Sequence, residues 1–207
     1  MRWVNKTITN ENILIRFASL WILGLAILLI VWSFSYTSLP EGSAEVTTTV
    51  SVVKYVPLTT EEVNSTFIRL FLYNTLVTML VIFLASLVKV KGYSLGYIIV
   101  LYHWALYGLF LGTNSFLTPA ATKLIPSLVT LFKGSGIYEI TSYTMVAAAA
   151  FKVSIPIESI GLKVEKGWLV SKLKNKGFSW IEILTILLAV LLLAIANYLE
   201  AWQIFHQ

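Results

Sequence analysis

The chain has 207 residues and a formal net charge of +5, and 57% of its residues are hydrophobic while only 12% are charged. Soluble domains carry about 25% charged residues, so a soluble fold has no means of burying this much apolar surface. Cysteine is absent, which excludes disulfides, thiol nucleophiles, thiolate metal sites and iron–sulfur clusters, and every acidic side chain is a glutamate. We therefore expect a membrane protein that is not an enzyme and that holds no cofactor and no metal.

Apolar stretches of about twenty residues recur along the chain, which is the length that a helix needs to cross roughly 30 Å of hydrocarbon. The first is longer than the core of a typical signal peptide and is not followed by a small-x-small cleavage site, so we interpret it as a retained span. The predicted fold class is all-α, a polytopic membrane helix bundle that forms one transmembrane domain over residues 1–207. The five expected spans are residues 14–36, 67–88, 93–112, 135–151 and 180–202.

The first connection is a polar loop at residues 37–66. Its β-branched stretch at 46–53 favours an extended strand or small hairpin. Thr59 and Glu62 have capping-box spacing, so the second helix is expected to begin outside the lipid.

The segment 116–136 is interrupted by prolines and does not have the pattern of a continuous span. We expect a short helix at 120–132 that either lies in the membrane interface or re-enters the membrane. Lys123 and Lys133 favour a shallow position, because each would be costly at the bilayer centre.

Four glycines in the membrane part are candidates for packing or for breaking a helix. Gly108 and Gly112 are spaced to let two helix backbones approach closely. Gly134 and Gly136 flank Ser135 and are expected to interrupt the chain before the fourth span.

Lysine and arginine are concentrated in three segments, residues 1–16, 89–92 and 152–179, which the positive-inside rule assigns to the cytoplasm. The loop at 37–66 is acidic and is therefore assigned to the outside. Five spans satisfy all of these assignments, so we expect a multi-pass protein of the cell membrane with a cytoplasmic N-terminus and an extracytoplasmic C-terminus.

The basic cytoplasmic loop at 152–179 interleaves lysines with Trp168 and Leu169, which is typical of a segment lying on anionic lipid headgroups. Topology determination alone also explains these charges. Their position on one membrane face argues against binding to nucleic acid. We expect membrane lipids and other membrane or envelope proteins as partners, including a second copy of the chain. The lysines expected near the headgroups are Lys163, Lys166, Lys172, Lys174 and Lys176.

Polar residues within the expected spans are the strongest functional candidates, because lipid makes them costly. At 1.5 Å per residue, Asn74 lies roughly 10 Å below the outer surface, while Glu139 and Asn197 lie roughly 20 and 24 Å above the inner one. These side chains therefore share a depth in the outer third of the bilayer. Glu200, one turn beyond Asn197, is expected at the outer interface.

Two interpretations of this cluster remain open. Its hydrogen bonds can hold the helices together, as polar contacts between membrane helices commonly do. Alternatively, Glu139 can belong to a proton or substrate site. His103 is expected to be a hydrogen-bonded structural residue, because a single imidazole cannot form a metal site. Ser135 with His103 is a weak candidate for an intramembrane serine protease, since nothing in the sequence places the two in hydrogen-bond reach.

Four segments resemble, in order and character, the stage II sporulation protein M (SpoIIM) family of bacteria and archaea. They cover most of the chain from residue 67 onward, although Ser135 stands where the family often has histidine before its Gly-x-x-Glu element. The resemblance implies functional positions at Asn74, Gly112, Gly136, Glu139 and Glu200. The matching segments are Phe71-Leu-Tyr-Asn74-Thr-Leu, Gly108-Leu-Phe-Leu-Gly112, Gly136-Ile-Tyr-Glu139-Ile and Ala194-Ile-Ala-Asn-Tyr-Leu-Glu200-Ala201.

The resemblance further implies a multipass membrane protein without established catalysis, which in sporulating bacteria works beside cell-wall hydrolases. We therefore expect a non-enzymatic membrane scaffold or assembly protein that recruits cell-envelope partners. The alternative is a transporter or permease-like component with Glu139 in a polar intramembrane site.

Overall fold

The computed structural model describes residues 6–44, 63–116, 120–156 and 177–206. The described helical elements are α2 (Ile13–Ser38), α4 (Val63–Tyr73), the π-helical η2 (Asn74–Met79), α5 (Leu80–Ser86), α6 (Leu95–Thr113), α7 (Leu128–Lys133), α8 (Gly136–Ala150), the 3₁₀ turn η3 (Phe151–Val153) and α10 (Trp180–His206). The described strands are β1 (Val88–Val90), β2 (Tyr93–Ser94) and β3 (Ile155–Pro156).

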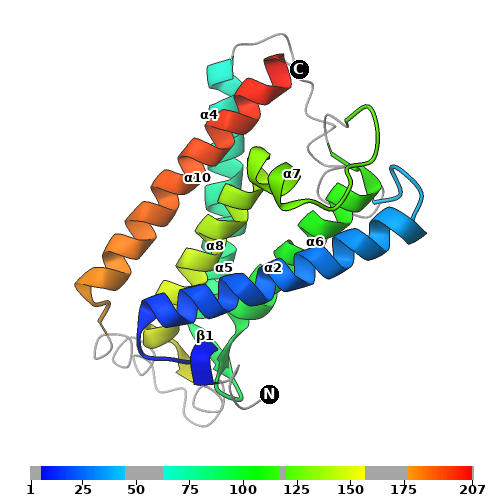
Figure 1. The fold of residues 1–207 in the computed structure, drawn as a ribbon. Coiled ribbons are helices and arrows are strands. Elements are labelled where there is room, and N and C mark those ends of the chain that lie inside the picture. The colour runs from blue at the N-terminus through cyan, green and yellow to red at the C-terminus, as the bar shows by residue number, and fades with distance from the viewer. Residues whose placement is uncertain (1–5, 45–62, 117–119, 157–176, 207) are drawn as a thin grey trace.

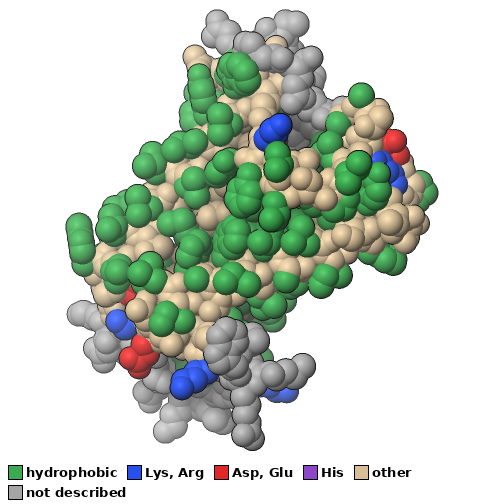
Figure 2. Space-filling model, in the orientation of Figure 1, with side chains coloured by type: hydrophobic (Ala, Val, Ile, Leu, Met, Phe, Trp, Pro, Cys, Tyr) green, Lys and Arg blue, Asp and Glu red, His purple; other side chains and the backbone are tan. Residues whose placement is uncertain are grey.

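The chain is a helical bundle, and four helical stretches among the described residues are long and apolar enough to cross a membrane. Hydrophobic side chains are spread over the face of the bundle shown in Figure 2. This confirms the expected membrane class of fold. The four stretches agree with the first, second, third and fifth expected spans to within about one helical turn. They are Ile13–Ser38, Val63–Ser86, Leu95–Thr113 and Trp180–Phe205.

The helices form two pairs with α8 between them. In Figure 1, α2 lies along α6, α10 lies along α4, and α8 runs through the middle of the bundle. With 15 residues, α8 is shorter than each of the four long stretches, and at 1.5 Å per residue it extends roughly 22 Å. It is the most enclosed helix, since Ala147, Ala148, Ala149 and Ala150 are all fully buried.

Helices α2 and α6 run in the same direction and pack through glycine. A Cβ atom placed on Gly108 would lie 2.5 Å from the Leu28 carbonyl oxygen, and one on Gly112 would lie 2.7 Å from the Tyr36 nitrogen. The backbones approach so closely here that no side chain fits between them. Ser35 also donates a 3.3 Å hydrogen bond to the Gly108 carbonyl across this contact.

Tryptophan side chains connect α8 to the α2–α6 pair. Trp21 of α2 donates to Thr141 of α8 at 2.9 Å, and Trp104 of α6 donates to Thr144 at 3.1 Å. The two indole rings meet edge to face with centroids 5.6 Å apart. Each indole thus buries apolar area while its N–H donates a hydrogen bond to a threonine of α8.

A small sheet at one end of the bundle departs from the all-α expectation. Strands β1 and β2 form an antiparallel hairpin, and β3 pairs with β1 in parallel. Lys91 and Gly92 form the turn and both have positive φ, 50° and 87°. Positive φ at both central residues is typical of a type I′ hairpin turn, so the tight turn expected at 89–92 is stabilised by strand pairing.

The helix expected at 120–132 is wrong in extent, because α7 contains only Leu128–Lys133. Pro126 has no N–H and restricts the residue before it, which excludes a continuous helix through this position. The preceding stretch is instead attached to the end of α2. Trp32 donates to the Leu124 carbonyl at 2.9 Å, and Lys123 donates to the Tyr36 carbonyl at 3.2 Å and to that of Leu39.

Several expectations fall outside the described residues. These are the strand at 46–53, the capping box of Thr59 and Glu62, and the lipid-facing lysines between 163 and 176.

Candidate functional site

Asn74 and Asn197 connect two helices through their side-chain amides. Asn74 Nδ2 donates to Asn197 Oδ1 at 2.6 Å, and Asn197 is fully buried. Asn197 Nδ2 in turn donates to the Leu193 carbonyl of its own helix at 2.7 Å. The contact joins η2 to α10 and shows that the two asparagines lie at the same level of the bundle.

The Asn74 side of this contact is a π-helical turn. η2 spans Asn74–Met79, and the Leu80 N–H donates to the Thr75 carbonyl five residues earlier. Such π-turns are rare, and many of them occur at functional sites. The Thr75 hydroxyl oxygen is buried and has no hydrogen-bond partner among the described residues.

Glu139 lies on α8 and is bound by a neighbouring tyrosine. The Tyr143 hydroxyl donates to Glu139 Oε1 at 2.6 Å and also hydrogen-bonds with Thr78 of η2. The His103 ring packs against Tyr143 with centroids 5.7 Å apart. Its Nδ1 lies 2.8 Å from the Ile99 carbonyl, which acts as the acceptor, so this nitrogen carries the proton.

Glu200 of α10 lies within electrostatic range of Glu139. Tyr107 of α6 lies within range of both carboxyl groups. Two acidic side chains of the membrane part therefore lie near enough to influence one another, which the sequence did not indicate. Residues 197 and 200 are three apart and share one helix face, so the face that brings Asn197 to Asn74 also brings Glu200 toward α8.

The glycines at the chain break make room for Tyr107. A Cβ on Gly136 would lie 2.5 Å from the Tyr107 ring, and one on Gly134 would lie 2.9 Å from its hydroxyl oxygen. Gly134 also ends α7, and α8 begins at Gly136. The two glycines at the break therefore form the surface against which Tyr107 packs. From this position Tyr107 lies within electrostatic range of the two glutamates.

The structure thus brings together polar side chains from four helical elements: Asn74 and Thr78 from η2, Tyr107 from α6, Glu139 and Tyr143 from α8, and Asn197 and Glu200 from α10. We call these seven residues the polar layer. Two carboxyl groups in one layer can hold a proton or a small cation between them. Alternatively, the surrounding hydroxyl and amide groups can form hydrogen bonds with these carboxyl groups that serve only to hold the helices together.

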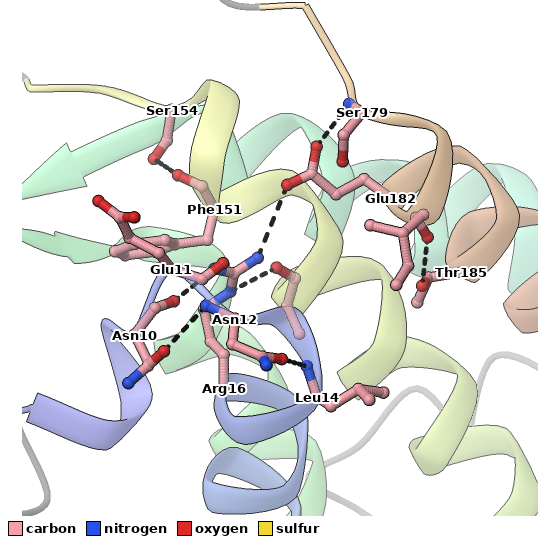
Figure 3. A network of polar contacts seen from close by, with 12 residues as sticks. Asn10, Glu11, Asn12, Leu14, Arg16, Phe151, Ser154, Ser179, Glu182 and Thr185 are labelled. Carbon is pink, nitrogen blue, oxygen red and sulfur yellow. Dashed lines mark hydrogen bonds and ion pairs between the residues drawn. The ribbon is translucent and has the colours of Figure 1, made fainter.

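A second buried polar site was not predicted from the sequence. Arg16 of α2 is fully buried, and its Nη2 lies 4.0 Å from Glu182 Oε1 of α10 (Figure 3). Arg16 Nε donates to the Ala148 carbonyl at 2.8 Å, and Nη1 donates to the Asn10 carbonyl at 2.6 Å. Its guanidinium also lies 5.1 Å from the centroid of the Phe151 ring. One side chain therefore joins the N-terminal segment, α8 and α10.

Glu182 is fixed from its other side by the start of α10. The Ser179 N–H donates to Glu182 Oε2 at 2.8 Å, which is the reciprocal half of a capping box. The spacing of Ser179 and Glu182 could have indicated this helix start. From the sequence, Arg16 is only one of the positive charges that assign residues 1–16 to the cytoplasm. Nothing near it in the sequence indicates that it pairs with a residue near the other end of the chain.

The described residues contain no group of three or more His, Cys, Asp or Glu side chains that could hold a metal ion. Two hollows in the described part of the chain lie at the β1–β2 end, and neither is lined by residues of the polar layer. Comparisons with protein-family models, curated proteins and solved structures found no match for this chain.

The hydrogen bond between Asn74 and Asn197 should contribute a measurable coupling free energy to the stability of the bundle. In a double-mutant cycle with Asn74→Leu and Asn197→Leu, we expect a coupling of about 0.6 to 1.7 kcal/mol, as for hydrogen bonds between other membrane helices. Leucine keeps the side-chain volume and removes the amide. Reversible unfolding of each variant in mixed micelles gives the free energies from which this coupling is calculated. A control cycle that pairs Asn74→Leu with Thr185→Val, at a half-buried site on α10, should be additive to within about 0.5 kcal/mol.

Proposed function

We propose that this chain is a non-enzymatic membrane scaffold or assembly protein of the cell envelope, similar in role to the SpoIIM family. The observation that supports this proposal is that the polar side chains of the membrane part connect one helix to another. Such contacts hold a bundle in one arrangement. They are Asn74 with Asn197, Trp21 with Thr141, and Trp104 with Thr144.

The scaffold proposal includes five membrane crossings, with the N-terminus in the cytoplasm and the C-terminus outside. The start of α2, the β1–β2 hairpin, the end of α8 and the start of α10 gather at one end of the bundle in Figure 1. Lysines of the described part at this end include Lys6, Lys89, Lys91 and Lys152, which supports assigning it to the cytoplasm. In this arrangement α8 is the fourth crossing.

Partner recruitment is tested by crosslinking in native membranes followed by identification of the attached proteins. We expect a small, reproducible set of envelope proteins attached through the 37–66 and 152–179 loops. The proposal fails if the attached proteins are the same abundant ones that an unrelated five-span protein captures.

A transport component is the second candidate, and the approach of Glu139 to Glu200 favours it. Two carboxyl groups in an apolar layer are costly, and intramembrane acids commonly mark proton or ion pathways. In this role, Glu139 exchanges a proton or binds a cation as the helices around the break move.

Glu139→Gln separates the two candidates, because glutamine keeps the side-chain shape and the oxygen that accepts from Tyr143 but cannot ionise. For a scaffold, we expect the crosslinked partners to be unchanged and liposomes to show no flux that depends on the protein. For a transport component, dissipation of a pH gradient in liposomes should occur with the unmodified chain and be lost in the variant. Glu11→Gln, at an exposed site outside the bundle, is the matched control and should leave both measurements unchanged.

A further inference from the structure

Two hollows adjoin at the β1–β2 end of the bundle and share Lys91 and Tyr93. The first has a volume of about 410 Å³ and is lined by Lys6, Thr9, Lys91, Gly92 and Tyr93. The second has a volume of about 330 Å³ and is almost entirely apolar, with Leu20 of α2 and Ile98 and Leu101 of α6 among its walls. A basic hollow thus lies beside an apolar one.

Both lysines are held in place by ordered structure. Lys91 is at the turn of the β1–β2 hairpin, whose positive φ angles direct the chain sharply away from β1. Lys6 precedes Ile8, which is buried, and the Ile8 carbonyl accepts a 3.1 Å hydrogen bond from the Tyr97 hydroxyl of α6. Lys6 and Lys91 are themselves exposed. In the described part of the chain, neither has a carboxylate within 4.0 Å.

The apolar hollow faces the region where lipid lies. Ile98 is 62% exposed although it belongs to a membrane-crossing helix. Its neighbours in the hollow come from the N-terminal segment, α2, the hairpin and α6, so the groove follows the α2–α6 seam away from the lysines. A ligand that fits both hollows needs a negative group at one end and a hydrocarbon chain at the other.

We propose that this composite groove binds one anionic phospholipid, with its phosphate on Lys6 and Lys91 and one acyl chain along Leu20, Ile98 and Leu101. Basic pockets next to membrane helices on the cytoplasmic side bind acidic lipid headgroups in this way. A soluble anion would leave the apolar hollow unfilled, and an apolar peptide would leave two lysines unpaired. Neither Lys6 nor Lys91 belongs to the group of lysines at 163–176. The site depends only on this end of the bundle lying at a membrane surface, so it can fail without affecting the scaffold role.

Native mass spectrometry of the full chain tests the proposal, with phosphatidylglycerol and phosphatidylcholine of identical acyl chains as probes. We expect the chain to prefer phosphatidylglycerol. The double variant Lys6→Gln/Lys91→Gln should bind it roughly 25-fold more weakly, because each lysine near an anionic surface contributes about fivefold in affinity. Lys133→Gln, an exposed lysine on α7 outside the groove, should retain the preference.

The apolar half is tested by Ile98→Trp, which fills the groove without changing the charge. We expect this variant to lose tight binding of phosphatidylglycerol, while Leu187→Trp, at a similarly exposed site on α10, should not. Equal affinity in the double-lysine variant and the Lys133→Gln control would overturn the proposal. Unchanged affinity in Ile98→Trp, or displacement of the lipid by millimolar inorganic phosphate, would also overturn it.

Discussion

Replacing Arg16 with alanine should destabilise the bundle by about 3–5 kcal/mol, the typical cost of removing one partner from a buried ion pair. The variant leaves the Glu182 carboxylate buried without its cation, since that side chain is only 3% exposed. It also removes the donors to the Asn10 and Ala148 carbonyls. Equilibrium unfolding in mixed micelles measures the loss, with Lys133→Ala as the surface control.

A double variant determines whether the Arg16 effect comes from the unpaired charge. Arg16→Met/Glu182→Leu replaces both charged groups with apolar side chains, and exchanging a buried pair in this way is often neutral or stabilising. We therefore expect the double variant to be more stable than either Arg16→Ala or Glu182→Ala. If its destabilisation equals the sum of the single effects, the two side chains act independently and the ion pair does not hold α2 to α10.

The spans could be predicted because their signal is local. A run such as residues 14–36 must be helical in lipid, where each N–H and C=O needs a partner within its own segment. The strands β1 and β3 could not be found in this way. Their pairing brings Val88 next to Ile155, and strands of three and two residues are too short to leave a periodic pattern in a sequence.

The polar layer could be anticipated in part, because helix rise converts residue number into depth. Asn74 and Asn197 were placed at one level and do form a hydrogen bond. Depth does not determine which way a side chain points around its helix. For this reason the roles of Tyr107 and Glu200 around Glu139 became visible only with coordinates. The Arg16–Glu182 pair could not be predicted for the same reason. In addition, the positive-inside rule already accounts for a positive charge near the end of a span.

The glycine contacts between α2 and α6 give a prediction in which two physical effects oppose one another. In a helix, Gly→Ala is normally stabilising by up to about 1 kcal/mol, because alanine has the higher helix propensity. At Gly108 the added methyl would lie 2.5 Å from the Leu28 carbonyl oxygen, and at Gly112 it would lie 2.8 Å from the Trp32 carbonyl oxygen. Both atoms are backbone and cannot move aside without shifting α2.

We therefore expect Gly108→Ala and Gly112→Ala each to destabilise the bundle by about 1–3 kcal/mol, the usual cost of overpacking a close contact. Gly177→Ala is the control without crowding, because this glycine precedes α10 and a Cβ there would meet no atom within 4 Å. It should change stability little. The same unfolding measurement in mixed micelles reports all three variants. If Gly108→Ala proves more stable than the unmodified chain, helix propensity outweighs the clash, and α2 and α6 do not pack as closely as their backbones indicate.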